Sequence, residues 1–219
     1  PEDIRLLSLM VKLQTQSRDQ AGAIDSLTRI IKLQPRNFSH RRNLAAFFVA
    51  NQKPDKARKV LEQAITDLPD SVDAKMGLVQ FLKSVDGELA AFNRLQEFIN
   101  KDRGNFELRL MLAQLYQTSK EMDKAKAEFQ HIIEQGAETK QGQKAMYHLA
   151  LINISEGDFS AAKQQVEAML KENATSAEAF MLKGQIALHE QDIDGAIADF
   201  KQVLRTEPES AVVLGLLAR

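Results

Sequence analysis

Apolar residues return along the chain at one long interval, and a small residue marks the same place in each interval. An alanine that opens an apolar cluster occurs six times, with spacings of 34, 34, 34, 37 and 34 residues. These alanines are Ala23, Ala57, Ala91, Ala125, Ala162 and Ala196. A period of this length predicts an array of similar units that each contact their neighbours. A generic helical bundle, the alternative, does not require a fixed spacing.

The residues that follow each alanine predict a helix. A larger apolar residue stands four places later, and another apolar or small residue stands three places after that, which puts all three on one helical face. The first set is Leu27, Leu61, Leu95, Phe129, Val166 and Phe200, and the second is Ile30, Ala64, Phe98, Ile132, Met169 and Val203. Proline, glycine or asparagine then marks the helix end in most units.

The residues that precede each alanine predict another helix. An apolar residue stands ten places earlier in every unit: Leu13, Phe47, Phe81, Leu115, Ile152 and Ile186. Small or slender residues stand two places before those, where a neighbouring helix can approach closely. Lys183 departs from the pattern, because other units have leucine or methionine there and Leu182 stands beside it. Either the pattern is shifted by one place here, or the lysine stem lies along the core. Each unit therefore reads as two helices of about 13 residues joined by a short polar turn.

The pattern resembles the tetratricopeptide repeat. The residues that carry the resemblance best run from Ala179 to Gly184 and from Gly195 to Phe200, with Pro208 behind them; Leu112, Ala113, Tyr116, Ala125 and Phe129 are similar. The resemblance implies an all-α fold, a solenoid in which antiparallel helix pairs form a right-handed superhelix, of bacterial appearance. We predict one array with repeats at about 4–37, 38–71, 72–105, 106–139, 143–176 and 177–210, and a partial seventh at 211–219.

Two departures from the family pattern have structural consequences. The tryptophan that is typical of the first helix is absent, and its place is taken by Leu7, Arg41, Lys75, Arg109, Met146 and Phe180. Three extra residues separate the fourth and fifth repeats near 139–142. We expect a longer helix or turn at that point, with a local break in the superhelix.

In this family the first helices line a concave groove that binds an extended peptide or a partner helix. The resemblance places these candidate groove residues on that face: Arg5, Lys12, Arg42, Met76, Gln80, Lys83, Leu110, Gln114, Tyr147, Leu151, Ile154, Met181 and Leu188. The N-terminal half of the set is cationic and polar, and the C-terminal half is apolar. The apolar members either contact a partner or pack against neighbouring helices. Tyr147 is the best single anchor candidate, because tyrosine is enriched at interfaces.

Composition excludes several classes of function. The 219 residues include 29 basic and 30 acidic side chains, a formal net charge of −1, so a sequence-independent nucleic-acid site is not expected. There is no cysteine, which excludes disulfide frameworks and thiolate metal sites. The apolar runs are too short for a membrane span.

The sequence offers no pattern for catalysis, and we expect no catalytic residue, cofactor or metal. None of the four histidines stands at a metal-binding helical spacing from another, and no glycine-rich phosphate loop is present. The acidic residues Asp67, Asp70, Asp73, Asp192 and Asp194 are interpreted as residues of helix caps and turns.

The sequence therefore predicts a non-enzymatic scaffold for a protein or peptide partner. The alternative is a targeting module of a larger bacterial envelope, exopolysaccharide, protein-sorting or glycosyltransferase protein. Because the chain starts at Pro1 and stops inside an apolar helix pattern, we expect a fragment of a longer protein. The compartment, cytoplasmic or periplasmic and envelope-associated, stays open. Self-association is expected through Ala211–Arg219, whose apolar face has no predicted neighbour.

Overall fold

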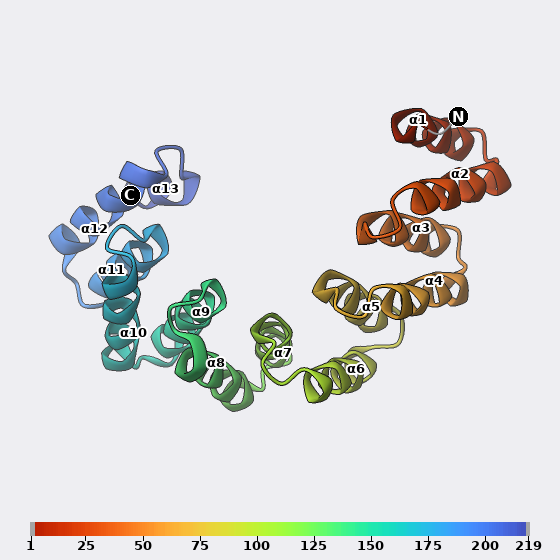
Figure 1. The fold of residues 1–219 in the computed structure, drawn as a ribbon. Coiled ribbons are helices and arrows are strands. Elements are labelled where there is room, and N and C mark those ends of the chain that lie inside the picture. Colours follow the sequence, from red (N-terminus) through yellow and green to blue (C-terminus); the bar gives the residue numbers. More distant parts are fainter. Residues whose placement is uncertain (1–2, 218–219) are drawn as a thin grey trace. The chain divides into compact units, whose positions relative to one another are not determined.

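The computed structural model describes residues 3–217, and this part of the chain forms thirteen α-helices and no strand (Figure 1). The all-α prediction is therefore confirmed. The contacts divide the chain into two compact units, which meet between Arg103 and Gly104. Each unit is described by itself.

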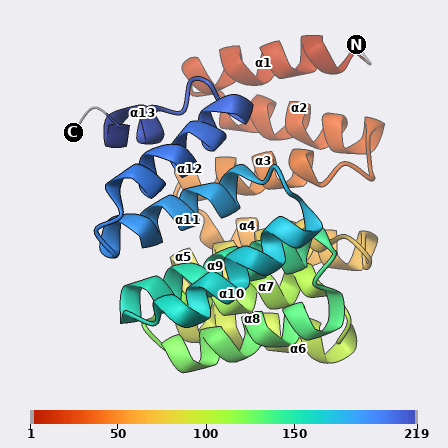
Figure 2. The ribbon, with the colours of Figure 1, turned by 90° about the vertical axis from the view of Figure 1, so that its left-hand side faces the viewer.

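The first unit contains six helices, in which each odd-numbered helix packs against the even-numbered helix that follows it. Their bounds are α1 (Ile4–Gln16), α2 (Gln20–Leu33), α3 (Phe38–Ala50), α4 (Pro54–Asp67), α5 (Val72–Val85) and α6 (Glu88–Lys101). Figure 2 shows α1, α2 and α3 lying side by side in chain order. Each pair consists of a first helix and a second helix, and α3 also contacts α5, the first helix of the next pair.

The second unit repeats this arrangement. Its helices are α7 (Phe106–Thr118), α8 (Met122–Gly136), α9 (Lys140–Glu156), α10 (Phe159–Glu172), α11 (Ala177–His189), α12 (Ile193–Thr206) and the short α13 (Ala211–Leu217). The first helices α7, α9 and α11 contact one another in succession. Helix α9 has 17 residues, whereas the other first helices of complete pairs have 13 or 14. The expected longer helix near 139–142 is thus present.

The turn inside most helix pairs depends on one residue in the left-handed backbone region. Gly157 has φ 81°, and non-glycine residues occupy the same place in four other pairs at φ 57–65°. These are Arg18, Gln52, Lys120 and Gln191. A left-handed non-glycine residue costs about 1 kcal/mol, so the packing of the two helices must hold these turns in place.

The core of each unit forms around the recurring alanines, all six of which are fully buried. The residues four and seven places later are buried as well. Gly184 is the small residue of the first helix α11 in the sixth repeat. A Cβ added there would lie 2.5 Å from the Phe200 ring of α12, so the two helices approach closely at this point. At the apolar position ten places before each alanine, Leu13 is 55% exposed and Phe47 is half-buried, whereas the other four residues are buried.

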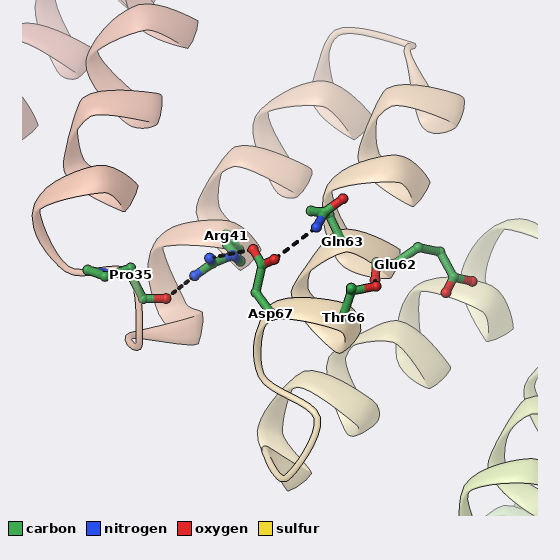
Figure 3. Close-up of polar contacts among 6 residues, drawn as sticks. All are labelled: Pro35, Arg41, Glu62, Gln63, Thr66 and Asp67. Atoms are coloured by element: carbon green, nitrogen blue, oxygen red, sulfur yellow. Dashed lines mark hydrogen bonds and ion pairs between the residues drawn. The ribbon is translucent and has the colours of Figure 1, made fainter.

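Two arginines stand where the family pattern has tryptophan. Each forms an ion pair with a carboxylate on the second helix of its own repeat. The buried Arg41 donates from Nη2 to Asp67 Oδ2 at 2.8 Å and from Nη1 to the Pro35 carbonyl (Figure 3). Gln63 Nε2 also donates to Asp67, at 2.8 Å. In the second unit, Arg109 pairs with Glu128 in the same way at 2.8 Å.

Asp67 therefore has a role that the sequence did not predict. It is the last residue of α4 and binds a buried arginine, so the interpretation as a cap or turn residue is wrong for this position. Asp192 does cap a helix, because its carboxylate accepts the Gly195 N–H at the start of α12 at 2.9 Å. The difference arises because Arg41 is 26 residues away in sequence and meets Asp67 only in the folded helix pair.

Candidate functional site

The groove residues predicted in the first unit lie on α1, α3 and α5 and are mostly polar and solvent-accessible. Arg5, Lys12, Arg42 and Gln80 are exposed, and Met76 and Lys83 are half-buried. The charge of Lys83 is partly offset, because its Nζ lies 3.4 Å from Glu88 Oε1. These six positions therefore present mainly charged and amide groups, although α1 also exposes the apolar side chains of Leu6, Leu9 and Leu13.

In the second unit, one predicted groove residue lies in the core. Leu110 is 5% exposed and belongs to a buried cluster with Phe129 and Ile132. The assignment of Leu110 as a groove contact is therefore wrong, and the alternative expectation, packing against a neighbouring helix, holds for this residue. The sequence spacing could not show this, since an apolar residue on a first helix faces either the groove or the second helix.

The remaining apolar candidates are partly accessible. Tyr147, Leu151 and Ile154 on α9 are half-buried and pack at the edge of a core cluster that includes Val166. Met181 on α11 is half-buried against a second cluster, and Leu188 is 38% exposed. We call the set Gln114, Lys144, Tyr147, Leu151, Ile154, Met181 and Leu188 the first-helix strip. Most of these apolar side chains pack against neighbouring helices, and part of their surface is still accessible to a partner.

A pocket of about 370 Å³ opens beside Tyr147. Its walls come from α9, from the end of α10 and from the start of α11. The lining residues are Lys140, Gln143, Lys144, Tyr147, Met169, Asn173, Ser176 and Glu178. Three positions predicted for the groove face, Lys144, Tyr147 and Glu178, line this pocket, whereas Leu151 and Ile154 lie further along α9.

The extra turn of α9 supplies part of this pocket. Lys140 and Gln143 belong to the segment that the three additional residues create, and Gln143 is held by donating to the Ala137 carbonyl at 2.9 Å. Sequence reasoning located the insertion but did not assign it to the site. Asn173 was also missed, since it follows α10 and reaches the pocket only through the fold.

The charges around the pocket favour an acidic group. Lys140 and Lys144 stand four residues apart on α9, and neither makes an ion pair within residues 3–217. The one carboxylate of the lining, Glu178, accepts a hydrogen bond from Ser176 Oγ at 3.3 Å. An aromatic ring with two cations beside it suits a ligand that has both apolar and acidic parts.

His148 is the neighbour of Tyr147 and belongs to the support of α9. Its ring stacks on the buried Phe129 ring, with the centroids 5.3 Å apart and the planes at 6°. Its Nε2 lies 3.2 Å from Gln114 Nε2. Burial lowers the pKa of His148, and the positive charge of Lys144 lowers it further.

This environment predicts a pH dependence of stability. A lowered pKa means that the folded chain binds a proton at His148 less readily than the unfolded chain. The free energy of unfolding should therefore fall as the pH drops below 6.5, the ordinary value. Urea titrations at pH 7.5 and 5.5 would measure the fall, and His148→Gln should reduce it. An identical pH dependence in the variant would contradict the prediction.

The described residues hold no arrangement typical of a metal site or a membrane segment. No group of three His, Cys, Asp or Glu side chains between residues 3 and 217 is placed to hold a metal ion. No helix in that range is long and apolar enough to span a membrane.

Stacked helix pairs of this kind define an α-helical repeat protein, and comparison with known proteins gives the family. The sequence matches the model described as "Tetratricopeptide repeat-like domain" over residues 79–216. A second model, "Tetratricopeptide repeat", matches residues 11–71 and 47–103. The chain therefore belongs to the tetratricopeptide repeat family, whose members are generally non-enzymatic scaffolds that bind other proteins.

Solved structures show the same fold at low identity. PilF of Pseudomonas aeruginosa has a TM-score of 0.58 at 17% identity, over 97% of this chain and 96% of its own. PilW, a type IV pilus biogenesis factor, has a TM-score of 0.60 at 17% identity, over 98% of both chains. YrrB, a repeat protein with an unusual peptide-binding site, has a TM-score of 0.56 at 15% identity, over 90% of this chain and 100% of its own. A search of curated proteins found no match.

Proposed function

We propose that this chain is a non-enzymatic scaffold that holds a segment of a partner protein along the first-helix strip of its second unit. The single observation that carries the proposal is the pocket beside Tyr147, which combines an accessible aromatic ring with Lys140 and Lys144. The segment that fits has an apolar side chain for the pocket and an acidic residue near the two lysines. YrrB, of similar fold, is described as having a peptide-binding site, which supports binding as the general activity.

Site-specific photocrosslinking tests this proposal directly. A benzoylphenylalanine at position 147 should crosslink one protein in the native source, and the adduct should disappear when Lys140 and Lys144 are both changed to Glu. The matched control carries the crosslinker at position 164, because Gln164 is exposed on the second helix α10. The same adducts from both positions, or from the charge-reversed variant, would show that the pocket is not the working surface.

The alternative function is a module of an envelope or sorting system. PilW supports it, because that pilus biogenesis factor and this chain align over nearly their whole lengths. Fractionation of the native full-length protein would test the alternative. Recovery with the membrane or periplasm supports it, and recovery in the cytosol alone contradicts it.

Self-association is a further prediction, which rests on exposed apolar residues of α13. Val213 is buried, whereas Val212 is 65% and Leu214 is 48% exposed. The last two residues of the predicted contact, Ala218 and Arg219, lie outside the described residues. We expect the mass from light scattering to rise with concentration, and Val212→Lys with Leu214→Lys to reduce the rise. Leu89→Lys, at a position 74% exposed on α6, should not change it. A strict monomer at high concentration would refute the prediction.

A further inference from the structure

The sixth repeat differs from the others at two positions of its first helix, α11. Lys183 stands where the other five repeats have Met10, Leu44, Leu78, Leu112 and Leu149. All four leucines of this set are buried. Ala187 stands where the others have Gln14, Phe48, Leu82, Tyr116 and Asn153. Leu182, one place before Lys183, is fully buried in a cluster with Val166 and Met169, so the buried leucine of the sixth repeat is shifted by one place. Of the two positions, Ala187 is therefore the one at which this repeat has a smaller side chain than the others.

A second pocket, of about 330 Å³, lies at this place between α10, α11 and α12. Ala187 contributes only a methyl group to it, and the Lys183 ammonium is drawn to Asp199 Oδ1 at 3.0 Å. The apolar part of its lining comes from Val166, Leu170 and Ile186, together with small residues of α12. We call this space the sixth-repeat pocket; it shares no lining residue with the pocket beside Tyr147.

The rim of the sixth-repeat pocket has an excess of negative charge. Its two cations are already paired, since Lys163 lies 2.7 Å from Glu190 and Lys183 lies 3.0 Å from Asp199. Glu167 makes no hydrogen bond or ion pair within residues 3–217. Asp192 also lines the pocket, and its carboxylate caps α12. Four carboxylates against two ammonium groups leave two negative charges without a cation, which favours a positively charged ligand.

We propose that the sixth-repeat pocket receives an arginine side chain from a partner polypeptide. The aliphatic stem would lie on Val166, Leu170 and Ala187, with the guanidinium directed toward Glu167 at the rim. The volume is at the lower end for ligand sites and suits one long side chain rather than a larger molecule. Arginine fits better than lysine because its guanidinium is less strongly hydrated and binds carboxylates through two parallel hydrogen bonds.

An NMR titration of the 219-residue chain tests the proposal. The probe is the peptide acetyl-Gly-Arg-Gly-amide, and the reporters are the amide signals of Ala187, Gly195 and Ala198. We expect saturable shifts with a dissociation constant in the millimolar range, as for any ligand of so few atoms. The peptide acetyl-Gly-Gln-Gly-amide should not saturate the same signals.

Two variants separate the pocket from nonspecific attraction. Ala187→Leu restores the bulk that other repeats have, so it should weaken binding at least tenfold while the chain stays folded. Glu167→Gln should weaken it at least threefold, whereas Glu134→Gln, exposed on α8, should leave it unchanged. Unaltered affinity in Ala187→Leu, or absence of saturation in the wild-type chain, would overturn the proposal. Saturation by agmatine without saturation by the arginine peptide would overturn the assignment to a partner's side chain.

Discussion

Replacement of Phe129 by alanine is expected to lower the free energy of unfolding by about 3–5 kcal/mol. The ring is fully buried on α8 and packs in the cluster that includes Leu110 and Ile132. It also stacks on His148, so its removal leaves a cavity beneath α9. Since domains of this size are stable by about 5–15 kcal/mol, the loss should be plain in a urea titration followed by circular dichroism.

A matched control shows whether burial is the cause. Leu89→Ala removes an apolar side chain that is 74% exposed on α6 and should change stability by less than about 0.5 kcal/mol. Phe129→Leu, which keeps most of the apolar volume, should lie between the two. A loss below about 1 kcal/mol in Phe129→Ala would mean that α8 and α9 close over the cavity, contrary to the close packing of protein interiors.

Replacement of Arg41 by alanine is expected to cost about 2–4 kcal/mol. The Arg41 side chain is 8% exposed, and its loss leaves the Pro35 carbonyl and the Asp67 carboxylate without their buried donor (Figure 3). The cost stays below that of a fully buried pair, because Asp67 is 37% exposed and keeps the hydrogen bond from Gln63. Urea titration of the variant at pH 7 measures the change.

The neighbouring residue Arg42 provides the control, because it lies on the same helix and its side chain is exposed. Arg42→Ala should therefore stay within about 0.5 kcal/mol of the parent in its free energy of unfolding. Equal losses in the two arginine variants would contradict a specific role for the buried pair.

The same pair makes stability depend on pH. Hydrogen bonds from Gln63 and Arg41 lower the pKa of Asp67 in the folded chain. The stabilisation by Asp67 is thus present above the ordinary pKa of 3.8 and is lost as the pH falls through the lower pKa of the folded state.

The candidate site was predictable only in part. Tyr147 was predicted because its position on a first helix and its residue type both indicate an interface, and it lines a pocket in the structure. Leu110 was assigned to the same strip by the same reasoning, yet it faces the core, since a small rotation of the helix changes the side on which a residue lies. Asn173 had no sequence signal, because it reaches the pocket beside Tyr147 from the end of α10. Gln143 lies on α9 with Tyr147 and was missed because the insertion was not assigned to the site.

The sequence alone determined the repeat length, the all-α class and the alanines at the centre of each pair, because a period of 34 residues and a spacing of four and three are local properties of a helix. Only the tertiary structure decided how Arg41 meets Asp67, how the long α9 lines a pocket beside Tyr147, and how Lys183 and Ala187 come to line a second pocket. These features join residues from different helices. Their geometry depends on how helix pairs pack, and a one-dimensional pattern does not contain that information.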